Sequence, residues 1–328
     1  MATNTINENV EQAILDFGTI KQAIIDKGVE VPDGTPTSQY ATKIGEIQSG
    51  GSSSDDFKGM VERTATEVAL PSDCTKIGDY AFAIYISLTS VDIPKSVTSI
   101  GSYAFQLCKN LALTSLPESV TSINGHAFSE CTKLALTSLP EGITSIGENA
   151  FYGCTNLALT YLPSGITKIL GSTFHGCSNL ALTSLLESVT YIGYSAFSNC
   201  TNLALTSLPS GVTKIENYVF NNCVNLSLTS LPDGVTYIGN YAFANCTNLS
   251  LASLPDGVTS IEDYAFRGCT GLTEITFEGT PNSIDSTAFS GCTNLTTIRV
   301  PWAEGEVSGA PWGASNASLI YSYTPETT

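Results

Sequence analysis

The sequence has few charged residues, very few basic ones, and no long apolar run. Only 13% of its 328 residues are charged, and 13 lysines and arginines stand against 30 aspartates and glutamates, for a net charge of −17. This charge repels phosphate backbones, so nucleic-acid binding is not expected. No stretch has the ~20 apolar residues of a membrane-spanning helix, so no membrane insertion is expected. The first residues do not have the pattern of a secretory signal peptide.

Residues suited to catalysis or metal binding are also scarce. The only histidines are His126 and His175, which fall at different places in the repeat described below. They are therefore poorly placed to share a zinc ion or a catalytic dyad. No phosphate-binding loop or dinucleotide-binding glycine pattern precedes a helix. The sequence thus predicts a protein that is not an enzyme, with no catalytic residue, metal or cofactor.

What the sequence does contain is an internal repeat of 23 residues. A phenylalanine recurs at this spacing from Phe82 to Phe289, each with an isoleucine five residues before it and, after the first, a cysteine three residues after it. One such unit cannot bury its own apolar face, so consecutive units are expected to stack as coils around one continuous core. We expect the cysteines to be buried structural thiols, because they follow the core period. The structural ladder predicted in this way includes Phe105, Phe128, Phe151, Phe197, Phe243, Cys108, Cys131, Cys154, Cys200 and Cys246.

Each coil has recognisable local elements. The segments "VTSI" and "LTEITF" are rich in residues that favour strands. Pro-Ser-Gly and Pro-Asp-Gly are typical of turns. The segment "SYAFQLC" and its equivalents predict one short helical turn per coil.

The leucine run of each coil leaves two interpretations open. In the first coil the leucine run has apolar residues at Val91 and Ile93. In the middle coils a leucine stands one place before the position equivalent to Val91, as Leu205 does. A move of one residue along a regular strand transfers a side chain to the opposite face. Either the backbone changes register and the leucines stay buried, which we favour, or the leucines form an exposed contact stripe.

The unit I-x-x-x-A-F-x-x-C-x-x-L…L-P-x-x-V-T resembles the BspA-like branch of leucine-rich repeats. The resemblance covers about residues 61–301. It implies a right-handed leucine-rich-repeat solenoid of 23-residue coils, used for adhesion or recognition and without catalytic residues. Members of this branch occur on bacterial surfaces and in phage tail-associated proteins.

The two ends do not share the repeat. Residues 1–48 have two amphipathic helical patterns. These patterns predict a small α-helical module for attachment or for assembly of the chain into a homotrimer. This segment is similar to N-terminal segments of phage tail-associated proteins. Residues 49–57 predict a flexible linker, and residues 58–301 form the solenoid. Residues 302–328 predict an aromatic C-terminal cap and tail, in which Trp302 and Trp312 cover the last coil.

The residues that vary between coils are the candidates for a binding surface. Tyrosine and lysine in variable positions on a rigid frame are typical of binding surfaces. The alternative is that the tyrosines only cover the edges of the coils. The candidate residues are Tyr191, Tyr237, Lys168, Lys214, Tyr194, Tyr218 and Tyr241.

The sequence therefore predicts a recognition protein. The first hypothesis is a phage tail-associated structural protein of the virion that binds a protein or glycan on a bacterial surface. The alternatives are a bacterial cell-surface adhesin and a cytosolic scaffold for protein assembly.

Overall fold

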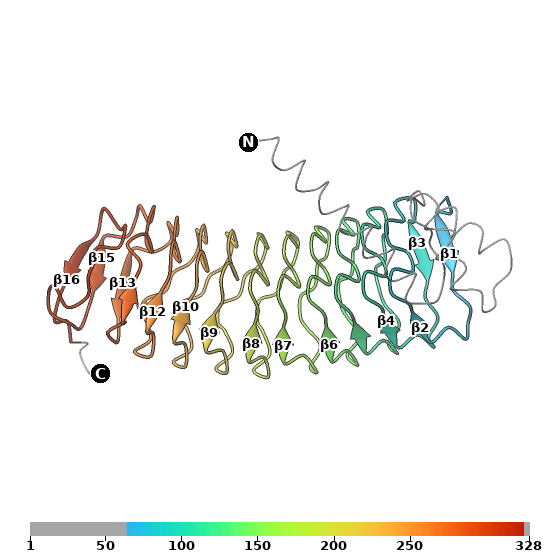
Figure 1. The fold of residues 1–328 in the computed structure, drawn as a ribbon, viewed down its shortest axis with the longest axis horizontal. Helices are drawn as coiled ribbons and strands as arrows, with labels where there is room; N and C mark the ends of the chain where they lie inside the picture. The colour runs from blue at the N-terminus through green and yellow to red at the C-terminus, as the bar shows by residue number, and fades with distance from the viewer. Residues whose placement is uncertain (1–63, 325–328) are drawn as a thin grey trace, which may run out of the picture.

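The structure, a computed structural model, describes residues 64–324. These residues form one elongated, slightly bowed stack of about 11 coils, with the described N- and C-terminal coils at opposite ends (Figure 1). Consecutive coils are offset by 23 residues, because each strand pairs in parallel with the strand 23 residues later, as Ser99 does with Ser122. The predicted leucine-rich-repeat solenoid of 23-residue coils is confirmed. The predicted helical module of residues 1–48 and the linker of residues 49–57 lie outside the described residues.

One row of very short strands runs along the whole stack, at the lower edge of Figure 1. Each strand comes from the "VTSI" segment, and its isoleucine is buried while the residue before it faces outward, as the alternation along a strand requires. The row consists of β2 (Lys76–Ile77), β4 (Ser99–Ile100), β5 (Ser122–Ile123), β6 (Ser145–Ile146), β7 (Lys168–Ile169), β8 (Tyr191–Ile192), β9 (Lys214–Ile215), β10 (Tyr237–Ile238), β12 (Ser260–Ile261) and β14 (Ser283–Ile284).

A second set of strands occurs only near the two ends of the stack (Figure 1). At the N-terminal end β1 pairs with β3, and at the C-terminal end four strands follow the order β11-β13-β15-β16. Their bounds are β1 (Glu67–Ala69), β3 (Ser90–Asp92), β11 (Ser253–Leu254), β13 (Glu274–Phe277), β15 (Thr297–Arg299) and β16 (Ser318–Ile320). The coils between β3 and β11 have no strand in the leucine run.

The prediction of a short helical turn in each coil was wrong: residues 64–324 contain no helix. Some amides of this segment bond within the coil, as Gln106 N does to Tyr103 O at 3.1 Å. The amides between them bond to the next coil, as Phe105 N does to Ala127 O at 2.7 Å. Tyr103 and Leu107 have φ values of 58° and 60°. This left-handed conformation interrupts a right-handed helix and turns alternate amides toward the neighbouring coil.

The leucine run changes register, and the leucines of the middle coils are buried. Ala112 N donates to Thr89 O at 2.9 Å, whereas the equivalent Ala135 N donates to Leu113 O at 3.0 Å, one residue further along the preceding coil. Leu205 is 0% exposed. The favoured interpretation is confirmed and the exposed leucine stripe is excluded. Leu113, at the coil where the register changes, is only half-buried.

The core is a set of stacked columns. The phenylalanine rings lie nearly parallel, with centroids 5.2 Å apart for Phe105 and Phe128 and 5.7 Å apart for Phe151 and Phe174. The cysteines from Cys108 to Cys292 form a neighbouring buried column without disulfides. Isoleucine, leucine and cysteine from each coil therefore bury their side chains mainly against the equivalent residues of the next coil.

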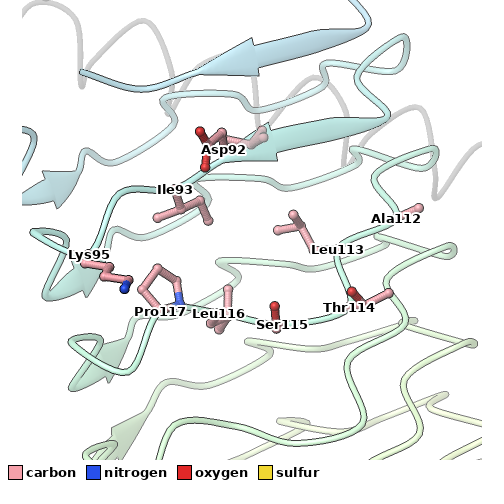
Figure 2. A pocket seen from close by; sticks show the side chains of 10 residues that line it. Asp92, Ile93, Lys95, Ala112, Leu113, Thr114, Ser115, Leu116 and Pro117 are labelled. Carbon is pink, nitrogen blue, oxygen red and sulfur yellow. The ribbon is translucent and has the colours of Figure 1, made fainter. Parts of the chain in front are cut away.

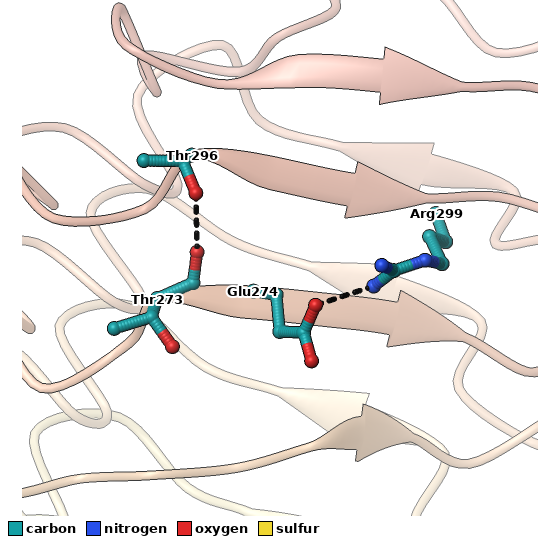
Figure 3. Close-up of polar contacts among 4 residues, drawn as sticks. All are labelled: Thr273, Glu274, Thr296 and Arg299. Atoms are coloured by element: carbon teal, nitrogen blue, oxygen red, sulfur yellow. Dashed lines mark hydrogen bonds and ion pairs between the residues drawn. The ribbon is translucent and has the colours of Figure 1, made fainter.

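The C-terminal coils are joined by polar contacts on the surface and by aromatic packing inside. Thr296 Oγ1 donates to Thr273 O at 3.2 Å, and Arg299 pairs with Glu274 at 2.7 Å between β13 and β15 (Figure 3). Trp302 and Trp312 are buried with ring centroids 6.2 Å apart.

Candidate functional site

The candidate site is built on four consecutive strands in the middle of the stack. Lys168, Tyr191, Lys214 and Tyr237 each occupy the outward-facing first position of β7, β8, β9 and β10. We call these four residues the Lys–Tyr row. Lys168 pairs with Tyr191 and Lys214 pairs with Tyr237 in the strand register. Lysine and tyrosine therefore alternate along one line on the surface.

The tyrosines around this row differ in how much surface they offer. Tyr191 is 39% exposed and Tyr194 is 49% exposed. The ring of Tyr194 lies against Gly171 of the preceding coil, where a β-carbon would clash with it. Glycine at position 171 thus allows a large aromatic ring to lie on the backbone of the neighbouring coil. Tyr237 is half-buried, and its hydroxyl donates to Asn217 Oδ1 at 3.3 Å.

Acidic side chains surround the two tyrosines of the row. Burial raises the pKa of Tyr191 above its ordinary value, and the carboxylates of Glu216 and Glu148 raise it further. Burial also raises the pKa of Tyr237, with Glu262 and Glu216 contributing. Both hydroxyls are therefore neutral at physiological pH, and the Tyr191 hydroxyl can donate a hydrogen bond to a ligand, whereas the Tyr237 hydroxyl donates to Asn217 Oδ1 and can accept one.

The two lysines of the row carry most of the positive charge available in this part of the solenoid. Between Lys133 and Arg267 they are the only lysines or arginines. Within residues 64–324, neither has an ion pair or a side-chain hydrogen bond. A flexible, unpaired ammonium group beside a tyrosine can meet an acceptor or an anionic group of a ligand.

Tyr218 and Tyr241 belong to a different column, in the turn that follows the short strand. Tyr218 stacks on Tyr241 with ring centroids 5.1 Å apart, and Tyr241 stacks on Tyr264 with centroids 5.0 Å apart. Both have left-handed backbones, with φ values of 59° and 54°. Tyr218, the first ring of this stack of three tyrosines, is 42% exposed, and Tyr241 is half-buried. These rings therefore cover the edges of the coils, and only Tyr218 presents a large free surface.

The histidines lie apart and both stack on tyrosines. His126 stacks on Tyr103 at 4.5 Å, and His175 stacks on Tyr152 at 4.6 Å. Burial lowers the pKa of His175. In the part of the chain that the structure describes, no group of three or more His, Cys, Asp or Glu side chains could hold a metal ion.

The ladder cysteines are buried, and burial raises their pKa values. Each ladder thiol donates to a phenylalanine carbonyl oxygen of the preceding coil, as Cys131 Sγ does to Phe105 O at 3.0 Å. A buried thiol with a raised pKa is a poor nucleophile, because the thiolate is the reactive form.

Sequence reasoning missed the acidic residues around the row and a surface pocket where the leucine run changes register. The alternation of Lys168, Tyr191, Lys214 and Tyr237 was visible in the sequence, but Glu148 and Glu216 stand in other columns. The register change was also visible, but its effect on the spacing between coils was not.

Comparison with known proteins identifies the repeat. The model of the BspA type leucine rich repeat region matches residues 57–181, 109–227 and 167–296. No curated protein matches the chain. In the part that the structure describes, no helix is long and apolar enough to cross a membrane.

Several solved structures resemble the chain. A leucine rich cell surface protein from Faecalibacterium prausnitzii is 30% identical over 73% of this chain and 80% of its own, with a TM-score of 0.46. A leucine-rich repeat protein from Bacteroides ovatus is 24% identical over 78% of this chain and 91% of its own, with a TM-score of 0.34. The pneumococcal vaccine antigen PcpA is 18% identical over 79% of this chain and 80% of its own, with a TM-score of 0.54, which shows a shared fold. With a family model matching most of its length, this chain belongs to the BspA-type leucine-rich repeat family.

Proposed function

We propose that this chain is a non-catalytic recognition protein, a surface leucine-rich-repeat adhesin that binds a protein or glycan of a bacterial surface through the Lys–Tyr row. The observation that carries the proposal is the row itself, where Lys168 and Lys214 flank the exposed Tyr191 on strands held by one continuous core. A rigid frame lowers the entropy lost on binding, and tyrosine supplies contact area with few rotatable bonds.

The family favours an adhesin over the phage-tail hypothesis. The 30% identical protein from Faecalibacterium prausnitzii is described as a cell surface protein. No comparison supports a tail-associated role or a place in the virion, and the family match begins at residue 57, after the segment that suggested that role. A bacterial cell-surface location is therefore the proposal.

Binding to intact bacterial cells tests the proposal. The labelled full chain is incubated with a panel of fixed bacteria, untreated or treated with protease or with periodate, which oxidises glycans. The double variant Tyr191→Ala, Tyr237→Ala should bind at least about tenfold more weakly, because truncation of central aromatic contacts costs more than about 1 kcal/mol each. Loss of binding after protease or periodate treatment would identify the ligand as a protein or a glycan.

Tyr161 provides a matched control. It is 47% exposed but lies in the leucine run rather than in the strand row. The variant Tyr161→Ala should bind like the unmodified chain. If the double variant keeps its thermal stability and binds as well as Tyr161→Ala, the Lys–Tyr row is not the binding surface.

We also propose that residues 1–48 assemble the chain as a homotrimer. The support is the pair of amphipathic patterns in the sequence. Light scattering should give a trimer for the full chain and a monomer for a chain that starts at Phe57. A monomer in both cases would contradict the proposal.

A further inference from the structure

Strand β3 has one paired edge and one free edge. On the paired side, Ser90 N donates to Thr66 O at 3.2 Å and Leu70 N donates to Asp92 O at 3.1 Å. In a parallel pair, successive residues direct their main-chain groups to opposite sides. The amide and carbonyl groups of Val91 therefore point toward the next coil, away from β1.

The next coil does not bond to this free edge. Ala112 N reaches Thr89 O, but after Ala112 the register changes, and no hydrogen bond within the described residues joins Val91 or Ile93 to residues 113–116. At the C-terminal end the equivalent strand β13 is paired on both sides, by β11 and β15. The free edge is therefore a consequence of the register change at this one coil.

A pocket of about 340 Å³ lies between β3 and the following coil (Figure 2). The side chains of Ile93 and Leu113 lie in the gap between the two segments (Figure 2). Leu113 is half-buried, whereas the equivalent leucines of the other middle coils are fully buried. The volume is at the low end of about 300–1,000 Å³ for ligand pockets, so the space suits a short segment rather than a large ligand.

The rim of the pocket carries one charge of each sign. Asp92 and Lys95 both line the pocket and are exposed. Neither has an ion pair or a side-chain hydrogen bond with another described residue. An occupant with a basic group beside Asp92 and an acidic group beside Lys95 would complement both charges.

We propose that this pocket, here called the β3 pocket, binds a short extended peptide of a partner protein. The peptide adds a strand to the free edge of β3, its main chain bonding to Val91 and Ile93. An apolar side chain of the peptide packs on Ile93 and Leu113, and its charged ends meet Asp92 and Lys95. Main-chain bonds supply affinity in this mode of recognition, and the side-chain pocket supplies selectivity. The site is separate from the Lys–Tyr row and does not depend on its function.

The first experiment uses the full chain labelled with ¹⁵N and the acetylated, amidated peptide Lys-Val-Thr-Val-Glu as probe. Titration should shift the amide signals of Val91 and Ile93. A peptide of the same sequence with N-methylated valines cannot donate the main-chain bonds and should bind about tenfold more weakly. No shift at Val91 and Ile93, or equal binding of the methylated peptide, would overturn the proposal.

A variant whose side chain fills the β3 pocket tests whether the peptide binds there. Ser115 lines the pocket, and the equivalent position two coils later is Tyr161, so this column accepts a tyrosine. The variant Ser115→Tyr should lose peptide binding. The matched control Ser207→Tyr changes the same column of a coil that does not line the pocket, and should bind normally. Equal binding by both variants would overturn the location.

A charge exchange tests the selectivity independently of pocket filling. The double variant Asp92→Lys, Lys95→Glu should lose binding to the original peptide and bind Glu-Val-Thr-Val-Lys instead. If both peptides bind the double variant and the original chain equally, the rim charges do not select the peptide. Self-association of the original chain that Ser115→Tyr abolishes would identify a second copy as the occupant, and would overturn the proposal.

Discussion

The thiol of Cys154 donates a hydrogen bond to the main-chain carbonyl oxygen of Phe128, 3.0 Å away in the preceding coil. Eight other ladder cysteines make the same contact, so the cysteine column links successive coils by side-chain hydrogen bonds as well as by packing. This contact explains why a thiol, rather than a methyl group, recurs at this position.

The variant Cys154→Ala should therefore be destabilised by about 1–3 kcal/mol, because it removes one of the two hydrogen bonds that the Phe128 carbonyl oxygen accepts, leaving only the bond from Cys131 N, and opens a small cavity. Urea unfolding measures the change. The control Cys74→Ala alters the half-buried cysteine outside the ladder and should change stability much less. Equal effects would show that the buried thiol contact of the ladder contributes no more than the exposed bond that Cys74 Sγ donates to Lys76 O.

The stability of the solenoid should fall at alkaline pH. Burial raises the pKa of Cys292 from about 9 to about 11. Between these two pH values the unfolded chain loses the Cys292 proton while the folded chain keeps it. The contribution of this thiol to the free energy of unfolding is therefore fully present below about pH 9 and is lost as the pH rises toward 11. Thermal unfolding from pH 8 to pH 10 measures the fall, and the variant Cys292→Ala should show a smaller one. An equally steep fall in the variant would assign the effect to other groups.

Alkylation of the folded chain should follow burial. Iodoacetamide at pH 8 should label the half-buried Cys74 first and the fully buried Cys154 and Cys177 last, because thiolate character and access control the rate. Mass spectrometry of the labelled peptides gives the order. Rapid labelling of the middle cysteines would contradict the burial of the column.

The left-handed turn at Gly176 should distinguish alanine from asparagine. Gly176 has a φ of 73°, and the nearest atom to an added β-carbon is 3.5 Å away. The variant Gly176→Ala should therefore cost about 1–2 kcal/mol from backbone strain alone. Asparagine tolerates this conformation, and it would extend the amide ladder in which Asn222 Nδ2 donates to Asn199 Oδ1 at 2.8 Å.

The variant Gly176→Asn should thus be less destabilised than Gly176→Ala in the same urea experiment. If both variants are equally unstable, loss of space rather than backbone conformation explains the effect.

Replacing single leucines of the leucine run with alanine should show how the register change alters their contribution to stability. Leu205→Ala removes a fully buried side chain and should cost about 2–5 kcal/mol. Leu113→Ala removes a half-buried side chain at the β3 pocket and should cost about 1 kcal/mol. Equal costs at the two positions would contradict the different environments of the two leucines.

Much of the fold could be predicted from the sequence, because ten recurrences of one spacing allow few arrangements. The positions of Ile146, Phe151 and Cys154 in one unit were enough to predict a stacked core. The paired short strands followed from the β-propensity of "VTSI". The helical turn could not be judged in this way, because the left-handed backbone at Tyr103 is sustained by bonds to the next coil, and local propensity contains no information about them.

The candidate site was predictable only in part. The alternation of Lys168, Tyr191, Lys214 and Tyr237 is a sequence pattern, and their alignment follows from the 23-residue period. The neighbouring Glu216 comes from another column, and the β3 pocket depends on how two unlike coils fit together. Both depend on distances between coils, which a repeat length does not specify.

The sequence by itself determined the stacking of the coils, the apolar columns and the repeat family, because each apolar residue recurs in phase and has only its own equivalents to pack against. The tertiary structure decided which side chains stay free and where the stack is imperfect. Leu205 and Leu113 occupy the same column, yet one is buried and the other lines a pocket. The physical reason is that a main-chain hydrogen bond shifted by one residue changes the fit between neighbouring coils, and that fit depends on both coils at once.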